Sequence, residues 1–268
     1  MLGAIIGDIV GSRFEFNSSN DYNFELFTDE CSFTDDTICT VAIADALLHG
    51  ADYRVSLHTW CRKYIHPKGG YGGRFRQWVL SDEPHPYNSF GNGSAMRVSP
   101  IAWQNLNADR MIYEAEKTAA CTHNHPEGIK GAQTIALAIH YGYELRRQST
   151  QINREDILNK FKKVLEFSGY DINIRREDVI NKFNETCQDT VPQALMAFFE
   201  SESFEDAIRN AISIGGDSDT LAAITGGIAE AYYGIPESIR KHALTFLDQR
   251  LLSILNAFEQ KYGIVAEK

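Results

Sequence analysis

The chain is organised around GGDSDT at residues 215–220, which opens an apolar helix that is predicted to run to residue 230. Asp217, Asp219 and Thr220 place two carboxylates and a hydroxyl at the start of this helix, where the first backbone N–H groups lack partners within the helix. One aspartate would be enough to cap the helix, which is otherwise almost without charge. Oxygen ligands at this density are those that a hard cation such as Mg²⁺ or Mn²⁺ prefers. The stretch therefore predicts a metal site at a helix N-terminus.

A second cluster of the same kind lies far upstream, in SFTDDT at residues 32–37, and opens a helix that is expected to end at His49, before Gly50. If the two helix starts meet, their carboxylates repel one another unless protons or cations neutralise them. Two divalent ions would balance the four charges, and threonine hydroxyls would complete the ligand shells. The alternative is that each cluster is only an N-cap, but the presence of both favours the metal site. The predicted ligands are Thr34, Asp35, Asp36, Asp217, Asp219 and Thr220.

Length and charge limit the class of protein. A chain of 268 residues can form one large domain or two small ones, and 43% hydrophobic with 23% charged residues is typical of a soluble globular protein. The formal net charge of −10 argues against a non-specific nucleic-acid binder or a binder of anionic membranes, since both need a basic surface. No apolar run reaches the length of a membrane span.

The cysteines and the first residues predict the compartment. The five cysteines are scattered, without a CxxC pair, which is typical of reduced thiols in the cytosol. Residues 1–8 lack the basic region of a signal peptide and include an early aspartate. We therefore expect a cytoplasmic protein.

Residues 3–12 are predicted to form a central helix. Gly3, Gly7 and Gly11 lie four residues apart and so share one face. Each glycine costs a helix about 1 kcal/mol relative to alanine, so a stripe of three indicates that another backbone packs close to this face. Asp8 stands among apolar residues, and both a hydrogen-bonded core carboxylate and a group behind the metal site are open interpretations.

Glu15 lies between Phe14 and Phe16, just after this helix. On a segment that folds over a pocket, a carboxylate flanked by aromatic rings can have a raised pKa and act as an acid or a base. The alternative is an exposed loop glutamate whose aromatic neighbours face the core.

Two further stretches are candidates for ligand binding. Residues 66–87 are rich in glycine, proline and aromatic residues, a composition that favours a functional loop over a linker. Gly91, Gly93 and Ser94 precede a predicted helix, where unshielded backbone N–H groups can bind an anion such as a diphosphate. The alternative for the second stretch is a plain turn with an N-cap.

Two histidines stand two residues apart, His123 and His125. No cysteine or third histidine lies at the spacing of a zinc site, so zinc is the less favoured interpretation. We interpret His123 as a ring that lines a pocket and stacks on or hydrogen-bonds with a ligand.

Apolar residues recur at helical spacing over most of the chain, and alternation with period two is almost absent. The charged segment 149–189 is predicted to form surface helices without chemistry, and one last amphipathic helix is predicted from Pro236 onward. The fold is therefore expected to be all-α with short connections. Further helices are predicted at residues 53–65, 109–120, 129–147, 191–199 and 204–214.

Taken together, five motifs resemble those of the ADP-ribosylglycohydrolase family, in the family's order and over nearly the whole length. The resemblance implies a single domain over residues 1–268, built as a compact orthogonal helical bundle with a dinuclear metal site at helix N-termini. The motifs are Gly7-Asp8 through Gly11-Ser12 with Glu15, FTDDT at 33–37, GNGSAMR at 91–97, Thr122-His123, and GGDSDT at 215–220.

The resemblance also implies roles for individual residues. The six ligands predicted above would hold two Mg²⁺ or Mn²⁺ ions. Glu15 would be the flap glutamate near the scissile bond, and catalysis is expected to depend on Glu15 and Asp36. His123 would lie beside the ligand, and the diphosphate cradle would be Gly91, Asn92, Gly93, Ser94 and Met96.

By this resemblance the expected activity is metal-dependent hydrolysis of the glycosidic bond between ADP-ribose and a modified protein side chain or a small molecule. The alternatives are a catalytically silent ADP-ribose-binding protein and a metal-dependent phosphohydrolase that cuts the diphosphate. All six candidate ligands and Glu15 are present, which argues against a silent member. The acceptor is left open, because residues 71–87 and 123–125 match neither the arginine-specific nor the serine-specific members.

Overall fold

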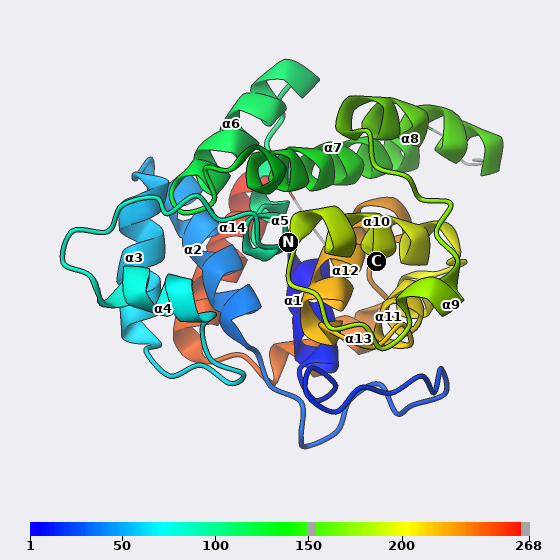
Figure 1. The fold of residues 1–268 in the computed structure, drawn as a ribbon, viewed down its shortest axis with the longest axis horizontal. Coiled ribbons are helices and arrows are strands. Elements are labelled where there is room, and N and C mark those ends of the chain that lie inside the picture. The colour runs from blue at the N-terminus through cyan, green and yellow to red at the C-terminus, as the bar shows by residue number, and fades with distance from the viewer. Residues whose placement is uncertain (149–153, 264–268) are drawn as a thin grey trace.

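The computed structural model describes residues 1–148 and 154–263, and among these it contains helices and no β-strand. The predicted all-α fold is therefore confirmed (Figure 1). None of the described helices is long and apolar enough to cross a membrane. The helices are α1 (Leu2–Gly11), α2 (Asp35–His49), α3 (Tyr53–Lys63), α4 (Gly73–Leu80), α5 (Gly93–Met96), η1 (Ser99–Trp103), α6 (Ala108–Ala120), α7 (Pro126–Gln148), α8 (Arg154–Ser168), α9 (Arg176–Val179), α10 (Cys187–Phe199), α11 (Phe204–Ile212), α12 (Ser218–Tyr233), α13 (Glu237–Leu244) and α14 (Gln249–Tyr262).

Helices α1 and α12 form the centre of the fold and pack against each other more extensively than any other described pair (Figure 1). They run antiparallel, and the glycine stripe of α1 faces the backbone of α12. A Cβ atom placed on Gly3 would lie 2.2 Å from the Gly226 carbonyl oxygen, and one on Gly7 would lie 2.0 Å from the Ala222 carbonyl oxygen. The backbones can approach this closely only because α1 has no side chain there, as the glycine spacing predicts.

Alanine at Gly7 should therefore destabilise the protein strongly. The added methyl group has no flexible neighbour to displace, so α1 and α12 would have to separate, and we expect a loss of about 3 kcal/mol or more in the free energy of unfolding. Thermal or urea unfolding measures this loss. Gly142→Ala in α7 is the matched control, because its nearest atoms would be 3.6 Å away and alanine favours the helix by up to about 1 kcal/mol. Equal melting temperatures for the two variants would contradict the prediction.

The remaining helices surround this pair. Helix α7 crosses one side of the molecule and packs against α6, α8, α10 and α12, while α2 packs against α3 and α14 (Figure 1). Helix α2 starts after Thr34, whose side chain accepts a hydrogen bond from the Asp36 N–H, and it ends at Gly50 with a φ of 66°. Both ends agree with the predicted capping residues.

The structure corrects two expectations about secondary structure and agrees with a third where it describes the residues. The single last helix predicted from Pro236 is wrong: the chain forms α13 and α14, because the Asp248 side chain accepts hydrogen bonds from two backbone N–H groups and caps a new helix. Residues 66–87, predicted as a loop, contain α4, which buries Phe75, Trp78 and Val79 at helical spacing. In the predicted surface segment 149–189, residues 149–153 lie outside the described residues, and α8 and α9 follow.

Candidate metal centre

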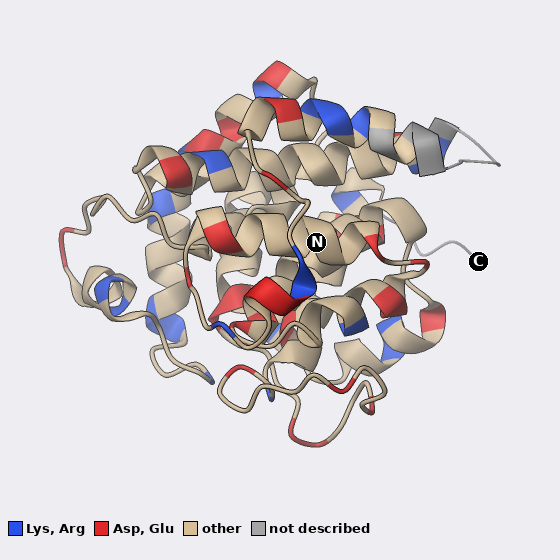
Figure 2. Cartoon of the chain, turned by 45° about the vertical axis from the view of Figure 1, so that its right-hand side comes forward, with Lys and Arg blue, Asp and Glu red and all other residues tan. Residues whose placement is uncertain are grey.

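The ends of three helices bring three buried carboxylates together. Asp8 comes from α1, Asp36 from the first turn of α2 and Asp219 from the first turn of α12. One oxygen of each carboxylate lies within 4.8 Å of the others, and the side chains are 0 to 3% exposed. Figure 2 shows acidic positions gathered near the middle of the molecule. The two predicted metal clusters, 180 or so residues apart in sequence, therefore meet in the fold.

Asp8 holds the start of α2. Its carboxylate accepts hydrogen bonds from the Thr34 N–H at 2.9 Å and the Thr34 hydroxyl at 2.7 Å. It also accepts from the Thr37 N–H at 3.1 Å and from the Thr37 hydroxyl at 2.5 Å. Asp8 is thus a hydrogen-bonded core carboxylate and also a neighbour of Asp36 and Asp219, so it has features of both interpretations that were left open above. Since its oxygens already accept four hydrogen bonds, we assign it a role in orienting α2.

Asp36 carries the observation that favours a cation. Its Oδ2 accepts a hydrogen bond from the Thr220 hydroxyl at 3.3 Å, but its buried Oδ1 has no hydrogen-bond partner. A buried carboxylate oxygen without a partner destabilises the folded state, because it loses its hydrogen bonds to water and forms none within the protein. A divalent cation bound by this oxygen and by Asp219 would supply the missing interaction, so the residues present fit the group that the sequence predicts.

The other predicted ligands are placed as follows. Asp35 and Asp217 line the same cavity as Asp36, Asp219 and Thr220, and Asp217 also accepts a hydrogen bond from the Asn92 amide at 2.6 Å. Thr34 is not one of the cavity-lining residues. Its hydroxyl donates to Asp8 and accepts from the Asp36 N–H at 3.2 Å, so it serves as the N-cap of α2. Five of the six predicted ligands therefore face one cavity, and Thr34 supports them from behind.

Burial and mutual repulsion raise the pKa values of these carboxyls. The pKa values of Asp35, Asp36 and Asp219 lie well above the ordinary range, first because burial disfavours the charged form and then because other carboxylates lie nearby. Burial likewise raises the pKa of Asp217. In Glu15, burial followed by the charge of Asp217 raises the pKa from 4.5 to about 7. Binding of cations would stabilise the ionised form of these crowded carboxylates.

We expect the melting temperature in EDTA to fall as the pH rises from about 5 to about 7. Each carboxyl group whose pKa is raised in the folded state binds its proton more tightly there than in the unfolded chain. Its protonated form therefore stabilises the fold at low pH, and this stabilisation is lost as the pH rises through the pKa of the folded state. The loss approaches about 1.4 kcal/mol per pH unit for each such group. Millimolar Mg²⁺ should raise the melting temperature and flatten this dependence. A melting temperature that Mg²⁺ leaves unchanged at every pH would contradict the metal site.

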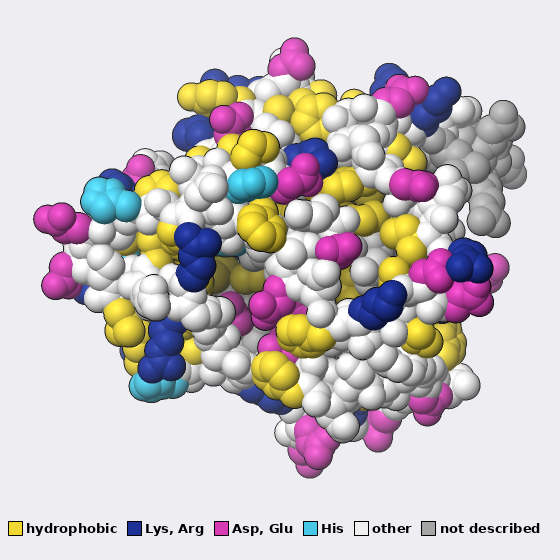
Figure 3. Space-filling view, in the orientation of Figure 1, with side chains coloured by type: hydrophobic (Ala, Val, Ile, Leu, Met, Phe, Trp, Pro, Cys, Tyr) yellow, Lys and Arg dark blue, Asp and Glu magenta, His cyan; other side chains and the backbone are white. Residues whose placement is uncertain are grey.

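The cavity that holds these carboxylates has a volume of about 270 Å³. Figure 3 shows acidic side chains beside a hollow near the centre of this face. Glu15 lines the cavity, as do the residues 91–93, which we call the glycine loop, together with Met96 and His123. Ser94 does not line it, because this buried side chain donates a hydrogen bond to the Gly128 carbonyl oxygen at 2.7 Å. Helix α5, which begins in the glycine loop, is only four residues long.

The two histidines have separate roles. His123 is buried in the cavity wall, and its Nδ1 lies 2.6 Å from the Thr122 hydroxyl oxygen. His125 is not one of the cavity-lining residues. Its Nδ1 accepts a hydrogen bond from the Glu127 N–H at 3.1 Å, and its ring contacts Phe90 at a centroid distance of 5.3 Å. This arrangement agrees with the interpretation of His123 as a pocket residue.

The cavity contains further residues that were not singled out in the sequence. Arg74 and Tyr87 come from the stretch that was expected to be functional, and the Arg74 guanidinium lies 4.9 Å from the centre of the Tyr87 ring. Arg97 is fully buried and also lines the cavity. Glu185 belongs to the charged segment to which no chemistry was assigned. Its sequence surroundings contain no motif, so only the fold could place it here.

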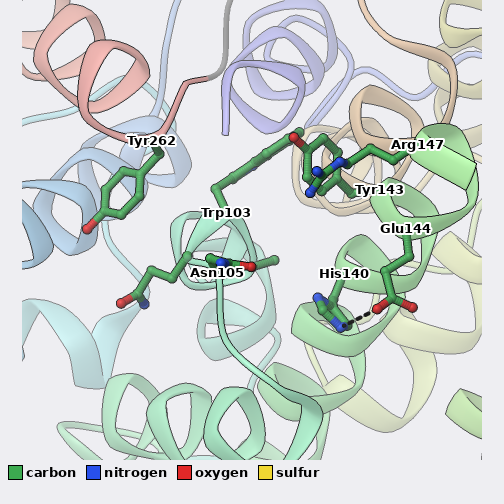
Figure 4. Close-up of a pocket in the computed structure, with 9 residues that line it drawn as sticks. Trp103, Asn105, His140, Tyr143, Glu144, Arg147 and Tyr262 are labelled. Carbon is green, nitrogen blue, oxygen red and sulfur yellow. Dashed lines mark ion pairs between the residues drawn. The ribbon is translucent and has the colours of Figure 1, made fainter.

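A larger cavity of about 420 Å³ lies elsewhere, between η1, α7 and the end of α14 (Figure 4). Its side chains interact with one another: the Trp103 and Tyr143 rings are 5.1 Å apart, and His140 faces Glu144 at 3.5 Å. Glu144 also pairs with Lys160 at 3.0 Å. Four aspartates line the smaller cavity, Asp35, Asp36, Asp217 and Asp219, and Asp36 has a carboxylate oxygen without a hydrogen-bond partner, so chemistry rather than size identifies the candidate site there.

Comparisons with known proteins identify the family and the fold. A family model described as ADP-ribosylglycohydrolase matches residues 1–263. The ADP-ribosylarginine hydrolase Tri1 of Pseudomonas putida (strain GB-1) is 26% identical over 296 aligned residues, which cover 94% of this chain and 75% of that protein. The ADP-ribosylhydrolase ARH3 of Homo sapiens is 26% identical over 312 residues, covering 89% and 86%. A solved structure described as "ADP-ribosylglycohydrolase-related protein complex" has the same fold, with a TM-score of 0.70, 22% identity, and coverage of 97% of this chain and 95% of that one.

Proposed function

Because the chain belongs to the ADP-ribosylglycohydrolase family, we propose that it hydrolyses the glycosidic bond that joins ADP-ribose to a modified protein side chain or a small molecule. The observation that supports this most directly is the meeting of Glu15, the acidic cluster and the glycine loop in one cavity. A carboxyl group with a raised pKa, a site for hard cations and a place for the diphosphate are the three parts that the reaction needs. The N–H groups of Gly91 and Asn92 already donate to the Ser89 Oγ at 3.1 Å and to the Glu185 carbonyl oxygen at 2.7 Å, so side chains beside the glycine loop would have to contribute to binding the diphosphate.

Two Mg²⁺ or Mn²⁺ ions would be held by the cavity-facing oxygens of the proposed ligands. When bound, such ions supply Lewis-acid chemistry: they orient sugar hydroxyls and lower the pKa of water. The proposed ligands are Asp35, Asp36, Asp217, Asp219 and Thr220, with Thr34 fixing the first turn of α2 behind them.

Glu15 would donate a proton to the leaving group or accept one from the attacking water. Cleavage at the anomeric carbon of the ribose passes through an oxocarbenium-like transition state, in which the leaving group needs a proton and the attacking water must lose one. In the cavity without cations, burial and the charge of Asp217 raise the pKa of Glu15 to about 7, and bound cations would lower it from there. A carboxyl group whose pKa lies in this range can serve in either step. The glycine loop and His123 would hold the diphosphate away from the reacting carbon.

The test is to incubate the protein with arginine-, serine- and nucleobase-linked ADP-ribosyl compounds, with Mg²⁺ and with EDTA, and to identify the product. The arginine linkage is tried first, because the similar Tri1 protein is named an ADP-ribosylarginine hydrolase. EDTA-sensitive release of free ADP-ribose supports the proposal and identifies the acceptor. AMP and ribose phosphate would instead indicate a phosphohydrolase. ADP-ribose binding without release from any linkage would indicate a binding protein and contradict the proposed activity.

A further inference from the structure

His123 connects the glycine loop to two polar residues deeper in the protein. Its Nε2 faces the glycine loop: Cβ atoms placed on Gly91 and Gly93 would lie 3.4 and 3.2 Å from it. The other ring nitrogen, Nδ1, lies 2.6 Å from the hydroxyl oxygen of Thr122. One edge of the ring thus faces the cavity and the opposite edge is held by a hydroxyl group.

The Thr122 hydroxyl also receives a hydrogen bond from Arg97. The Arg97 Nη2 donates to the Thr122 Oγ1 at 2.8 Å and to the Thr118 carbonyl oxygen at 2.9 Å. Arginine is only a donor, so the threonine oxygen must be the acceptor in this contact. The single hydroxyl proton of Thr122 remains free to be donated, and Nδ1 of His123 lies within reach.

These roles determine where the imidazole proton resides. If Thr122 donates to Nδ1, the neutral ring carries its proton on Nε2, and both the Thr122 hydroxyl and Nδ1 have a suitable partner. If Nδ1 carried the proton instead, the buried hydroxyl would have two donors facing it and no acceptor for its own proton among the contacts described for it. The first arrangement is therefore favoured. Burial and the nearby charges of Arg97 and Arg74 also lower the pKa of His123, which disfavours the doubly protonated ring.

Arg97 adds a positive charge behind this chain of hydrogen bonds. The side chain is 1% exposed, its Nε has no hydrogen-bond partner, and its two described acceptors are neutral oxygen atoms. A buried guanidinium of this kind attracts an anion into the cavity that it lines. It also polarises the threonine hydroxyl that holds the imidazole ring.

We propose that Arg97 and Thr122 are positioning residues that hold His123 as the neutral Nε2–H tautomer, so that it donates a hydrogen bond to an anionic oxygen of a ligand in the glycine loop. The ligand class is a diphosphate ester, and ADP-ribose is the example tested. This inference rests on the proposed function, because the proposed substrate supplies the diphosphate. It adds a fixed donor to a cavity that is lined by six carboxylate side chains.

The first experiment reads the tautomer directly from histidine side-chain ¹⁵N–¹H correlation spectra of the wild-type protein. The chain has eight histidines, and a His123→Gln variant assigns the signals of His123. We expect a protonated Nε2 and an unprotonated Nδ1 at neutral pH. A ring that is protonated on Nδ1, or on both nitrogens, would overturn the proposal whatever the protein hydrolyses.

The second experiment compares Thr122→Val with Thr122→Ser by calorimetry with ADP-ribose and by the split between KM and kcat. Valine keeps the shape of threonine but removes the hydroxyl, so we expect about a tenfold weaker Kd, a similar rise in KM and little change in kcat. Serine keeps the hydroxyl and should bind within about twofold of the wild type. The matched control is Thr134→Val in α7, which removes a buried hydroxyl that donates to the Lys130 carbonyl oxygen at 2.7 Å and lies outside this network.

The outcomes separate this inference from the proposed function. Equal ADP-ribose affinity of Thr122→Val and Thr122→Ser would overturn the inference even if the protein releases ADP-ribose efficiently. A correct tautomer together with weakened binding in Thr122→Val would support it even if no linkage is cleaved. If Thr122→Val does not fold, the wild-type spectrum still decides, because it shows directly which ring nitrogen of His123 carries the proton.

Discussion

Asp36→Asn is expected to abolish hydrolysis and, in EDTA, to raise the melting temperature. Activity should fall on the order of a thousandfold or more, because the variant loses the carboxylate oxygen that has no partner within the protein and is best placed for a cation. Stability should rise because one of several crowded negative charges disappears, while the amide oxygen can still accept from Thr220. An increase of a few degrees corresponds to about 1 kcal/mol or more in a chain of this size.

Two measurements check this prediction: ADP-ribose release with Mg²⁺, and thermal unfolding with and without EDTA. The opposite signs of the two effects distinguish a metal ligand from a residue that only supports the fold, since loss of a structural residue lowers both activity and stability. Asp29→Asn makes the same charge change at an exposed position and is the control. Turnover like that of the wild type in Asp36→Asn would refute the metal assignment.

Glu15→Gln is expected to lower kcat by about 10²- to 10⁴-fold, the range typical for loss of a general acid or base. Glutamine has nearly the same shape but cannot exchange a proton, so KM and the stabilisation by Mg²⁺ should change little. The raised pKa of about 7 also predicts that the pH dependence of kcat near neutrality disappears in the variant. Bound cations add positive charge to the cavity and would move that pKa downward, so the profile is best recorded at several Mg²⁺ concentrations.

Steady-state kinetics over a pH series, with Glu25→Gln as the exposed control, measures this effect. If Glu15→Gln raises KM and leaves kcat unchanged, Glu15 contacts the substrate but does not move a proton. That result would remove Glu15 from the mechanism while leaving the metal centre intact.

The all-α fold and the aspartates of the cavity could be predicted from the sequence because their signals are local, whereas Asn92 and Met96 were predicted only through the resemblance to the family. A helix start that contains more carboxylates than a cap needs can be recognised wherever it lies, as in Asp35-Asp36 and in Asp217 with Asp219. The glycine spacing of α1 predicted the close contact with another backbone, although the sequence could not identify α12 as the partner.

What could not be predicted depends on contacts between distant segments. Thr34 and Ser94 looked equivalent to the residues beside them, but hydrogen bonds to Asp8 and to the Gly128 carbonyl oxygen hold their side chains away from the cavity. Glu185 lies in a charged segment and enters the cavity only because that segment passes the glycine loop, where the Asn92 N–H donates to its carbonyl oxygen at 2.7 Å. The motifs therefore predicted only some of the residues that line the cavity.

The glycine contact between α1 and α12 also affects how far Asp8 and Asp219 can move when core residues are substituted. Asp8 and Asp219 belong to these two helices, and at their contact α1 contributes backbone atoms and no rotatable side chain. At the glycine positions no change of side-chain rotamer can alter this contact, so the distance between the helix backbones that carry Asp8 and Asp219 is set there by main-chain geometry. Substitutions elsewhere in the core can be accommodated by repacking of side chains, so we expect them to leave the distance between these two helix backbones unchanged.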